Sequence, residues 1–458
     1  MISQHRQRSR QLLADPDDRP AGRFVFIALC FIPMITTIAF GAVDVWALGV
    51  LAIFTATLVC GWIAGALNEG SFTISTNPIQ LPMLGLLAIG FVQLMPIWDS
   101  NVPTSLLTDS HRGTLSLDPY ATRLFIVRLM MQIVFFSAAL TFVNSRSRKK
   151  RLAILLVVFG GVVAFFGILQ RLAIPGSIYG IRPTPQAIPF GPLVNQHHFA
   201  ALMEMLSGLA IGILFGRAGG RDQKILLSLA AVIMAIAVFF TGSRGGLISY
   251  LGVVAFAAAA SFATDREAAG ASHLRNRTLI FAGSTVLVVL AIGSAMFLGG
   301  GEGLLRGIGA DTTTDITSGR WHFWGIALKI FLDHPVFGAG FDAFGVAFSR
   351  YDTWSGLYRV EQAHNDYLQT LADSGLLGFA CLAAFVFFLF RDGLRAIAEQ
   401  TDALKRSITL GAFAGCIGIL IHSFFDFPLR TPSNAFVFLL LVVLVVGSKK
   451  GNRSAHST

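Results

Sequence analysis

The sequence is poor in charged residues, which make up 13% of the chain, whereas hydrophobic residues make up 54%. A soluble globular chain carries about 25% charged residues, so this composition excludes an ordinary soluble enzyme or binding module. Most of the chain must instead be solvated by lipid. The net charge of +10 does not indicate nucleic-acid binding, because membrane proteins use Lys and Arg to orient their loops. We expect no nucleic-acid partner.

Cysteine pairs and carboxylate clusters are also lacking. The four cysteines all lie inside apolar runs, and their spacing fits neither a disulfide framework nor a CxxC metal motif. The aspartates expected on outer loops are isolated from one another: Asp44, Asp109 and Asp118. Because a divalent cation needs several oxygen ligands, we expect no metal and no cofactor. The first apolar run lacks a small-residue cleavage site, so we also expect no cleavable signal peptide.

Long apolar runs are abundant, and a membrane-spanning helix needs about 20 such residues. Twelve runs qualify: 24–41, 45–67, 79–97, 120–143, 151–171, 198–216, 224–240, 245–262, 278–298, 375–390, 407–424 and 432–447. The two runs that flank TGSRGG, 241–246, are so close that they should form a tight helical hairpin. The sequence therefore predicts an all-α integral membrane protein with about 12 transmembrane helices.

The placement of basic residues predicts the topology. With the N-terminus inside, 23 of the 35 Lys and Arg residues fall on cytoplasmic segments, as the positive-inside rule requires. We therefore expect both termini in the cytoplasm, as tails of residues 1–23 and 448–458. Helices 1–9 then occupy 24–298 and helices 10–12 occupy 375–447, with a large periplasmic loop, 299–374, between helices 9 and 10.

That 76-residue loop is too long to be a simple connection, and long loops are often functional. After Ser318, the stretch RWHFWGIALKIFL predicts an amphipathic helix with one apolar stripe, formed by Trp321, Trp324, Leu328 and Phe331. Interfacial helices carry this pattern. The following DHPVFGAGFDAFG, 333–345, predicts a stop and a turn. We expect the loop to fold as a helical cap on the outer leaflet.

Three arginines on the outer side run against the positive-inside rule: Arg244 in GSRGG, Arg320 in SGRW and Arg430 in DFPLR. An arginine near hydrocarbon costs a few kcal/mol, and no acidic cluster lies nearby in sequence. A phosphate group would fit, because Arg binds it through two parallel hydrogen bonds. Glycines around Arg244 would let the backbone approach a ligand, and Ser318 could cap the helix that begins at Arg320. The alternative is that each arginine only snorkels to lipid headgroups.

His364 lies in EQAHNDYLQTLADSGLLGF, 361–379, where a polar patch meets an apolar run. Histidine titrates near neutrality, so this residue is either a general base or an ordinary interface histidine. Its polar neighbours Glu361, Asn365 and Asp366 are candidate substrate-binding residues. Either Asp366 or Glu361 could orient the imidazole ring, and the sequence does not choose between them.

A second histidine pair, His197 and His198, at first suggests metal ligands. Adjacent positions on a helix point about 100° apart, however, and no HExxH motif follows. We therefore interpret the pair as polar residues at the start of a helix.

Several motifs together resemble the O-antigen ligase and polymerase superfamily of bacterial inner membranes. They are TGSRGG, SGRWHFW followed by DHPVFGAG, AHNDYLQTLADSGLLG and HSFFDFPLR. Their order is specific, and the family's histidine, ten residues, glycine signature is met by His364 and Gly375. The resemblance covers about residues 190–435. The first 180 residues match no motif of the family, so acceptor specificity stays open.

The resemblance implies a multi-pass protein with its active site on the periplasmic face. Such enzymes transfer a glycan from undecaprenyl diphosphate to a hydroxyl acceptor, which is a lipid A-core sugar in ligases. By motif, the catalytic residues would be Arg244 and Arg320 on the diphosphate and His364 as base, in an inverting, metal-independent reaction. Polymerisation of O-antigen or exopolysaccharide repeat units and transfer to protein side chains are the alternatives within the superfamily. Membrane lipids would be further partners.

A polysaccharide or lipid transporter is the non-enzymatic alternative, because it would also have about twelve helices and buried arginines. Transporters of this kind show inverted repeats and broken helices near the bilayer midplane. No repeat is evident between the two halves of this sequence, and its unusual polar residues gather near outer helix ends. These features favour the glycosyltransferase.

Overall fold

Helices make up almost all of the computed structural model, which describes residues 19–447 except 97, 100–111, 186, 217–219, 266–318 and 354–359. The first half contains α2 (Pro20–Ile38), η2 (Phe40–Ala42), α3 (Val45–Glu69), η3 (Pro78–Gln80), α4 (Leu81–Leu94), α5 (Pro119–Phe142), α6 (Arg146–Ala173) and α7 (Gln196–Phe215). The second half contains α8 (Arg221–Phe240), α9 (Arg244–Asp265), α12 (Arg320–Asp333), α13 (Phe344–Tyr351), α14 (Asp366–Glu399), α15 (Ala403–His422), η5 (Pro428–Arg430) and α16 (Pro432–Val446).

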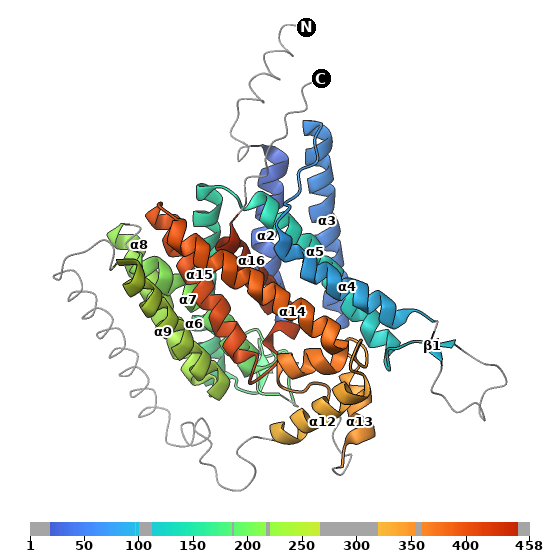
Figure 1. Ribbon diagram of the computed structural model, residues 1–458. Coiled ribbons are helices and arrows are strands. Elements are labelled where there is room, and N and C mark those ends of the chain that lie inside the picture. The colour runs from blue at the N-terminus through green and yellow to red at the C-terminus, as the bar shows by residue number, and fades with distance from the viewer. Residues whose placement is uncertain are drawn as a thin grey trace.

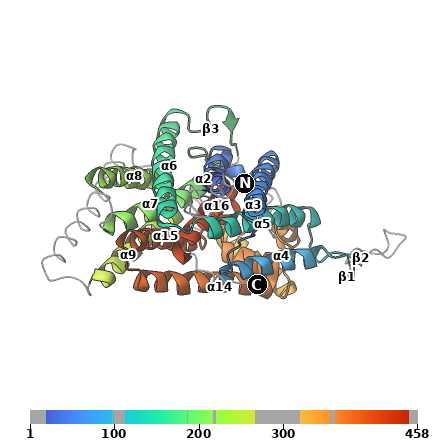
Figure 2. The same ribbon diagram turned by 90° about the horizontal axis from the view of Figure 1, so that it is seen from above.

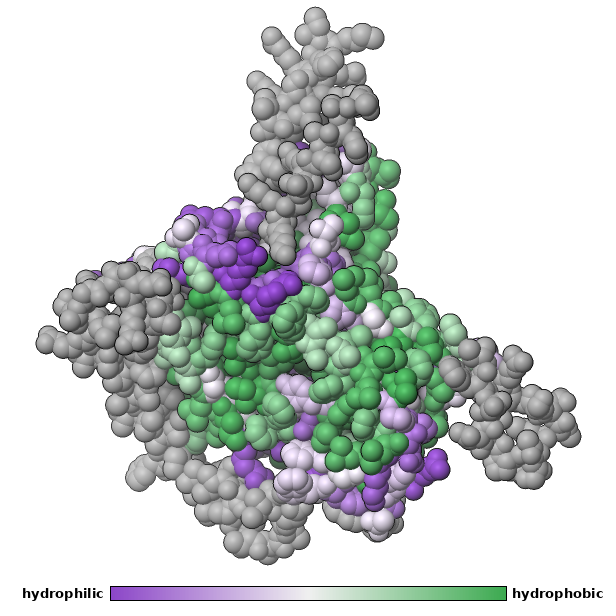
Figure 3. Space-filling view, in the orientation of Figure 1, coloured by the Kyte–Doolittle hydropathy of each residue, from purple (hydrophilic) through white to green (hydrophobic). Residues whose placement is uncertain are grey.

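The predicted class, an all-α integral membrane protein, is confirmed. Among the described residues, nine helices are long and apolar enough to cross a membrane, and two shorter apolar helices, Pro78–Leu94 and Pro432–Val446, accompany them. Eleven of the twelve predicted spans coincide with these helices, and the twelfth, 278–298, lies outside the described residues. A hydrophobic belt crosses the middle of the surface, with hydrophilic residues gathered above and below it (Figure 3).

Strands are confined to two short antiparallel pairs in the described connections. β1 (Trp98–Asp99) pairs with β2 (Arg112–Gly113), and β3 (Ser177–Ile178) pairs with β4 (Arg182–Pro183). Seen from above, β3 and α6 lie on the side of the bundle opposite to α14 (Figure 2). A bidentate ion pair between Arg182 and Asp44, at 2.5 and 2.9 Å, fastens the second hairpin to the connection between α2 and α3.

The antiparallel contact of α7 with α15 forms the centre of the bundle. Gly208 and Gly212 of α7 face Gly411 and Gly415 of α15, and a Cβ atom built on Gly212 would lie 2.1 Å from the Gly411 Cα. Small residues four apart let membrane helices approach closely. This packing brings the N-terminus of α7 beside the C-terminus of α15, where the polar residues of the candidate site gather.

A sharp bend in α14 explains the glycine of the histidine, ten residues, glycine signature. Gly375 has φ 62° and ψ −161°, a conformation open in practice only to glycine. The bend exposes the backbone N–H groups of Leu376 and Leu377, which donate to the carbonyls of Pro335 and Val336 at 2.8 and 3.3 Å. A Cβ atom on Gly375 would lie 2.4 Å from the Val336 oxygen. Gly375 therefore docks the segment after α12 onto α14.

The predicted amphipathic helix after residue 318 is present as α12, which lies with α13 at the lower end of the bundle in Figure 1. Its buried face consists of Ile326, Ala327 and Ile330. The predicted aromatic stripe points elsewhere, since Trp321 is 68% exposed. α12 therefore packs on the protein through one face and leaves the other apolar face uncovered, as an interfacial helix requires.

Candidate active site

His364 directly precedes the N-terminus of α14 and is held from three sides. Phe323 of α12 stacks on its ring at a centroid distance of 6.0 Å, and Phe427 meets the ring edge-on at 5.0 Å. The backbone of His364 has φ 50°, a left-handed conformation that is uncommon for a residue with a side chain. Such strain persists only where the surroundings impose it, and it is often found at functional sites.

The ring of His364 is oriented by Asp426, which follows α15. Nδ1 of His364 lies 3.1 Å from the Asp426 Oδ1, and the carboxylate side chain is 1% exposed. Burial alone would raise the pKa of Asp426, but the hydrogen bond with His364 and the nearby His197 and His198 hold it well below its usual range. An ionised carboxylate can only accept hydrogen bonds, so Nδ1 must carry the proton. In the neutral ring, Nε2 is then left with a free lone pair.

Asp366 and Glu361, the neighbours predicted to orient His364, are not the residues that contact its Nδ1 atom. The amide N–H of Asp366 donates to the Ser423 carbonyl at 2.8 Å, and its carboxylate accepts from the Ser423 hydroxyl at 2.9 Å. Glu361 is exposed. The structure places Asp426, and neither of these two residues, at Nδ1 of His364. The roles of Asp366 and Glu361 in substrate binding stay predictions.

Asn365 serves the backbone around the histidine. Its side-chain oxygen caps α14 by accepting from the N–H groups of Tyr367 and Leu368 at 3.0 and 3.1 Å, and its amide donates to the Phe424 carbonyl at 3.2 Å. Asn365 thus ties the start of α14 to the segment that carries Asp426. Its predicted role in substrate binding stays a prediction.

The two arginines assigned to the diphosphate come together from distant parts of the chain. Arg320 is the first residue of α12, and Arg244 is the first residue of α9. Burial lowers the pKa of Arg320, Asp426 raises it, and the positive charge of Arg244 lowers it. Asp426 and Arg244 are therefore each close enough to Arg320 for their charges to act on it. Ser318, predicted to cap α12, lies outside the described residues, and Gly319 holds the position before the helix.

The glycines after Arg244 have a packing role that the sequence did not indicate. A Cβ atom on Gly245 would lie 2.8 Å from the Phe425 Cβ, and one on Gly246 would lie 2.7 Å from the Ala200 Cβ. Their small size lets α9 begin directly against α7 and the end of α15. The tight hairpin predicted at TGSRGG is present, since α8 ends at Phe240 and α9 begins at Arg244.

His197 and His198 stand at the start of α7, as interpreted from the sequence, and each fastens a neighbouring segment. Nδ1 of His197 lies 2.8 Å from the Ser243 Oγ, which also accepts from the Gly246 N–H at 3.1 Å. Nδ1 of His198 lies 2.6 Å from the Thr431 Oγ1. Within the described part of the chain, no group of three or more His, Cys, Asp or Glu residues could hold a metal ion.

A second histidine–carboxylate pair, His422 and Glu204, lies near the His364–Asp426 pair. Nδ1 of His422 lies 3.0 Å from the Glu204 Oε1, and both side chains are at most 1% exposed. Ionisable residues at such depth in a membrane protein are rare and usually functional. The pair joins α7 to the last residue of α15, and Asp426 follows one turn later. Sequence analysis missed both Glu204 and His422, although a lone glutamate within an apolar run, MEMLSG, was a usable signal.

Arg430 differs from the other two arginines because its partners are carboxylates. It forms ion pairs with Asp342 and with Asp373, the latter at 2.6 Å. Burial lowers the pKa of Arg430, but Asp373 and Asp342 raise it above its usual range. Carboxylates therefore balance the charge of this arginine within the protein. The acids come from distant segments, so no cluster was visible near DFPLR.

The arrangement is suited to activating a hydroxyl beside an anion. His364 offers a lone pair on Nε2, Asp426 can stabilise the imidazolium that forms, and the arginines supply positive charge nearby. This is the pairing of base, orienting carboxylate and electrostatic stabiliser found in many group-transfer sites. The site thus has the features of a membrane-embedded transferase centre.

Comparison with known proteins agrees with this class. Residues 229–383 match the sequence model of the O-antigen ligase family. The exopolysaccharide production protein ExoQ of Rhizobium meliloti (strain 1021) is 23% identical over 171 residues. That alignment spans 36% of this chain and 38% of the relative, so the chain matches well under half of ExoQ.

Both comparisons support the O-antigen ligase and polymerase superfamily, and the resemblance expected from the motifs is confirmed. The matched region contains Arg244, Arg320 and His364. It ends within α14, before Asp426, Arg430 and both of the last two helices. The orienting carboxylate of His364 is therefore a feature of the structure and not of the family match.

Proposed function

We propose that the chain is a membrane glycosyltransferase that moves a glycan from undecaprenyl diphosphate to a hydroxyl acceptor. The observation that carries this proposal is the His364–Asp426 pair beside two arginines whose charges act on each other. A hydroxyl acceptor needs a base, and a diphosphate leaving group needs positive charge. The family match and the relative's role in exopolysaccharide production support glycan and lipid-linked substrates.

In the proposed reaction, the acceptor hydroxyl gives its proton to Nε2 of His364 while its oxygen attacks the anomeric carbon. The bond from this carbon to the diphosphate breaks, and its electron pair stays on the diphosphate oxygen. Arg244 and Arg320 stabilise the charge that develops there, as preorganised donors do in other transferases. Direct attack inverts the anomeric configuration. Asp426 stabilises the imidazolium, and the chemistry requires no metal.

Three acceptors are consistent with the site. The family description, O-antigen ligase, supports transfer to a lipid A-core sugar. The relative's name, an exopolysaccharide production protein, favours polymerisation, in which the acceptor is a second carrier-linked glycan. Transfer to a protein side chain remains within the chemistry of the same site.

We place the site on the periplasmic face of the bacterial inner membrane, with both termini cytoplasmic. The distribution of basic residues supports this topology, and so does the gathering of α12, α13 and the start of α14 at one end of the bundle (Figure 1). Labelling of a cysteine introduced at Lys329, an exposed residue of α12, tests it in intact cells with an opened outer membrane. Labelling only after the inner membrane is broken would contradict both topology and mechanism.

The reaction is tested with purified protein and a carrier-linked glycan, by measuring donor binding and glycan transfer separately. Wild-type protein should release undecaprenyl diphosphate only when a hydroxyl acceptor is present, in equal amounts with the glycosylated product. Transport of the intact lipid-linked glycan into the opposite leaflet, without release of the diphosphate, would indicate the transporter instead.

A further inference from the structure

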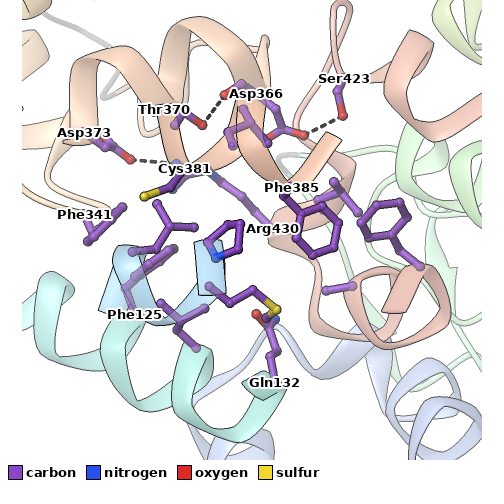
Figure 4. A pocket seen from close by; sticks show the side chains of 18 of the residues that line it. Phe125, Gln132, Phe341, Asp366, Thr370, Asp373, Cys381, Phe385, Ser423 and Arg430 are labelled. Atoms are coloured by element: carbon purple, nitrogen blue, oxygen red, sulfur yellow. Dashed lines mark hydrogen bonds and ion pairs between the residues drawn. The ribbon is translucent and has the colours of Figure 1, made fainter. Parts of the chain in front are cut away.

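A cavity of about 220 Å³ lies between α4, α5, α14 and α16, on the flank of the bundle (Figure 4). Most of its lining side chains are apolar, among them Leu86, Leu129, Phe385 and Phe438. An engineered protein cavity of about 150 Å³ binds benzene, so this cavity has room for roughly nine carbon atoms. It can hold a segment of one hydrocarbon chain.

Charged side chains complete the lining of the cavity. Arg128 of α5 and Arg430 of η5 both form ion pairs with the single carboxylate of Asp342. Two guanidinium groups thus enclose one anion, in the arrangement by which arginines also bind a phosphate. Arg128 lies about 14 Å along α5 from its first residue, and an arginine at such a depth is usually functional.

Among the carboxylates that pair with Arg128 and Arg430, Asp342 is the one that an incoming anion can displace. Its side chain is 15% exposed, whereas that of Asp373, the other partner of Arg430, is 1% exposed. Its backbone has φ 57°, a left-handed conformation that costs about 1 kcal/mol or more for a residue with a side chain. A partly exposed carboxylate on a strained backbone is easier to displace than a fully buried one.

Two further carboxylates face the cavity, and both have hydrogen-bond donors of their own. Asp366 accepts from Ser423, and Asp373 accepts from Arg430 and from the Gln369 amide at 3.1 Å. They therefore do not depend on the Arg128 charge. Displacement of Asp342 would leave that arginine for an incoming anion.

The cavity is lined by segments that also carry the candidate active site. Ser423 lines the cavity, whereas the preceding His422 faces Gly245 at the start of α9. Asp366 lines the cavity two residues after His364. The cavity and the candidate active site are thus built from the same two segments, the start of α14 and the residues that follow α15.

We propose that this cavity is a second lipid-phosphate site, in which one hydrocarbon chain enters the apolar part and its phosphate displaces Asp342 between Arg128 and Arg430. The occupant is a single-chain carrier phosphate or diphosphate. Its role as the carrier of the glycan acceptor rests on the proposed function, and it selects polymerisation over ligation. Binding itself does not depend on that role.

The test counts undecaprenyl phosphate molecules bound per chain by native mass spectrometry of the purified full-length protein. Wild-type protein should bind two, one at each site. Arg128→Gln should bind one lipid, because its affinity for the second lipid falls at least tenfold. Arg123 is a matched exposed arginine on α5, and Arg123→Gln should still bind two. Asp342→Asn should tighten the second binding event roughly three- to tenfold, because the competing anion is gone.

Arg128 and Asp342 form one ion pair, yet their variants should change the affinity for the second lipid in opposite directions. An ion pair with only a structural role would not give this result. If Arg128→Gln and Asp342→Asn both leave the second event unchanged, or both weaken it with a matching loss of thermal stability, the proposal is wrong. Leu86→Trp fills the cavity without touching an ion pair, and unchanged binding in this variant would also overturn it. Phosphatidylglycerol that competes as well as undecaprenyl phosphate would overturn the single-chain assignment.

The proposed function and this inference fail in different ways. If Arg244 and Arg320 do not form a diphosphate site, wild-type protein binds one lipid, and Arg128→Gln binds none. If the second site is wrong, the lipid count is the same in wild-type protein and in Arg128→Gln. Glycan transfer is measured separately and enters neither result.

Discussion

Replacing Asp426 by Asn isolates the contribution of the carboxylate to the orientation of His364. The volume hardly changes, but the amide can donate as well as accept, so it no longer forces the proton onto Nδ1. A hydrogen bond to a charged group contributes about 1.5–3 kcal/mol, which corresponds to a loss of roughly ten- to hundredfold in rate. The wrong tautomer can raise the loss to about 10⁴-fold. We expect a loss of 10²–10⁴-fold in glycan transfer.

The assay measures transfer with purified protein and carrier-linked glycan, together with donor binding. Donor affinity should change less than threefold, because the arginines hold the diphosphate. Because the pKa of Asp426 is held well below its usual range, its protonation should add no step to the pH profile of wild-type transfer above about pH 5. Asp392→Asn is the matched control, a buried aspartate of α14 that pairs with Arg391, and it should transfer at the wild-type rate. Asp426→Asn with full activity would refute the reasoning.

Three further predictions concern the arginines, the metal and the bend in α14. Arg244→Lys and Arg320→Lys should each lose at least tenfold in transfer although the charge is kept, because lysine cannot bind phosphate bidentately; full rates in well-expressed variants would indicate snorkelling. Activity should persist in excess EDTA, and restoration of a lost activity by magnesium or manganese would contradict metal independence. Gly375→Ala should lower the melting temperature in a thermal shift assay and reduce yield, because its Cβ would lie 2.4 Å from the Val336 oxygen; unchanged stability would mean that the bend relaxes freely.

Hydropathy predicted most of the fold because the bilayer imposes a length and composition on every spanning helix. It did not predict the bend at Gly375, since an apolar run looks the same whether it is straight or bent. The extension of α14 upstream to Asp366 was also missed, because its first turns are polar. Burial against α12 and the segment after it, and not lipid, stabilises this part.

The residues of the candidate site were mostly recognisable, but their pairing was not. His364, Arg244 and Arg320 stand in motifs whose order is informative. Asp426 lies 62 residues after His364, and Asp342 lies 88 residues before Arg430. Contacts at such separation are decided by helix packing, above all by the close α7–α15 crossing. Local sequence therefore suggested the neighbouring Asp366 and Glu361 as partners of the histidine.

The central claim, that His364 is the base of a glycan transfer, is tested most directly by His364→Ala in purified protein. Donor binding and transfer are measured on the same sample, beside a thermal unfolding scan. The account predicts that transfer falls at least 10²-fold, as for loss of a positioned base, while donor affinity and melting temperature stay close to wild type. Near-normal transfer, or a loss of transfer that only parallels a loss of stability, would contradict it and leave His364 a packing residue.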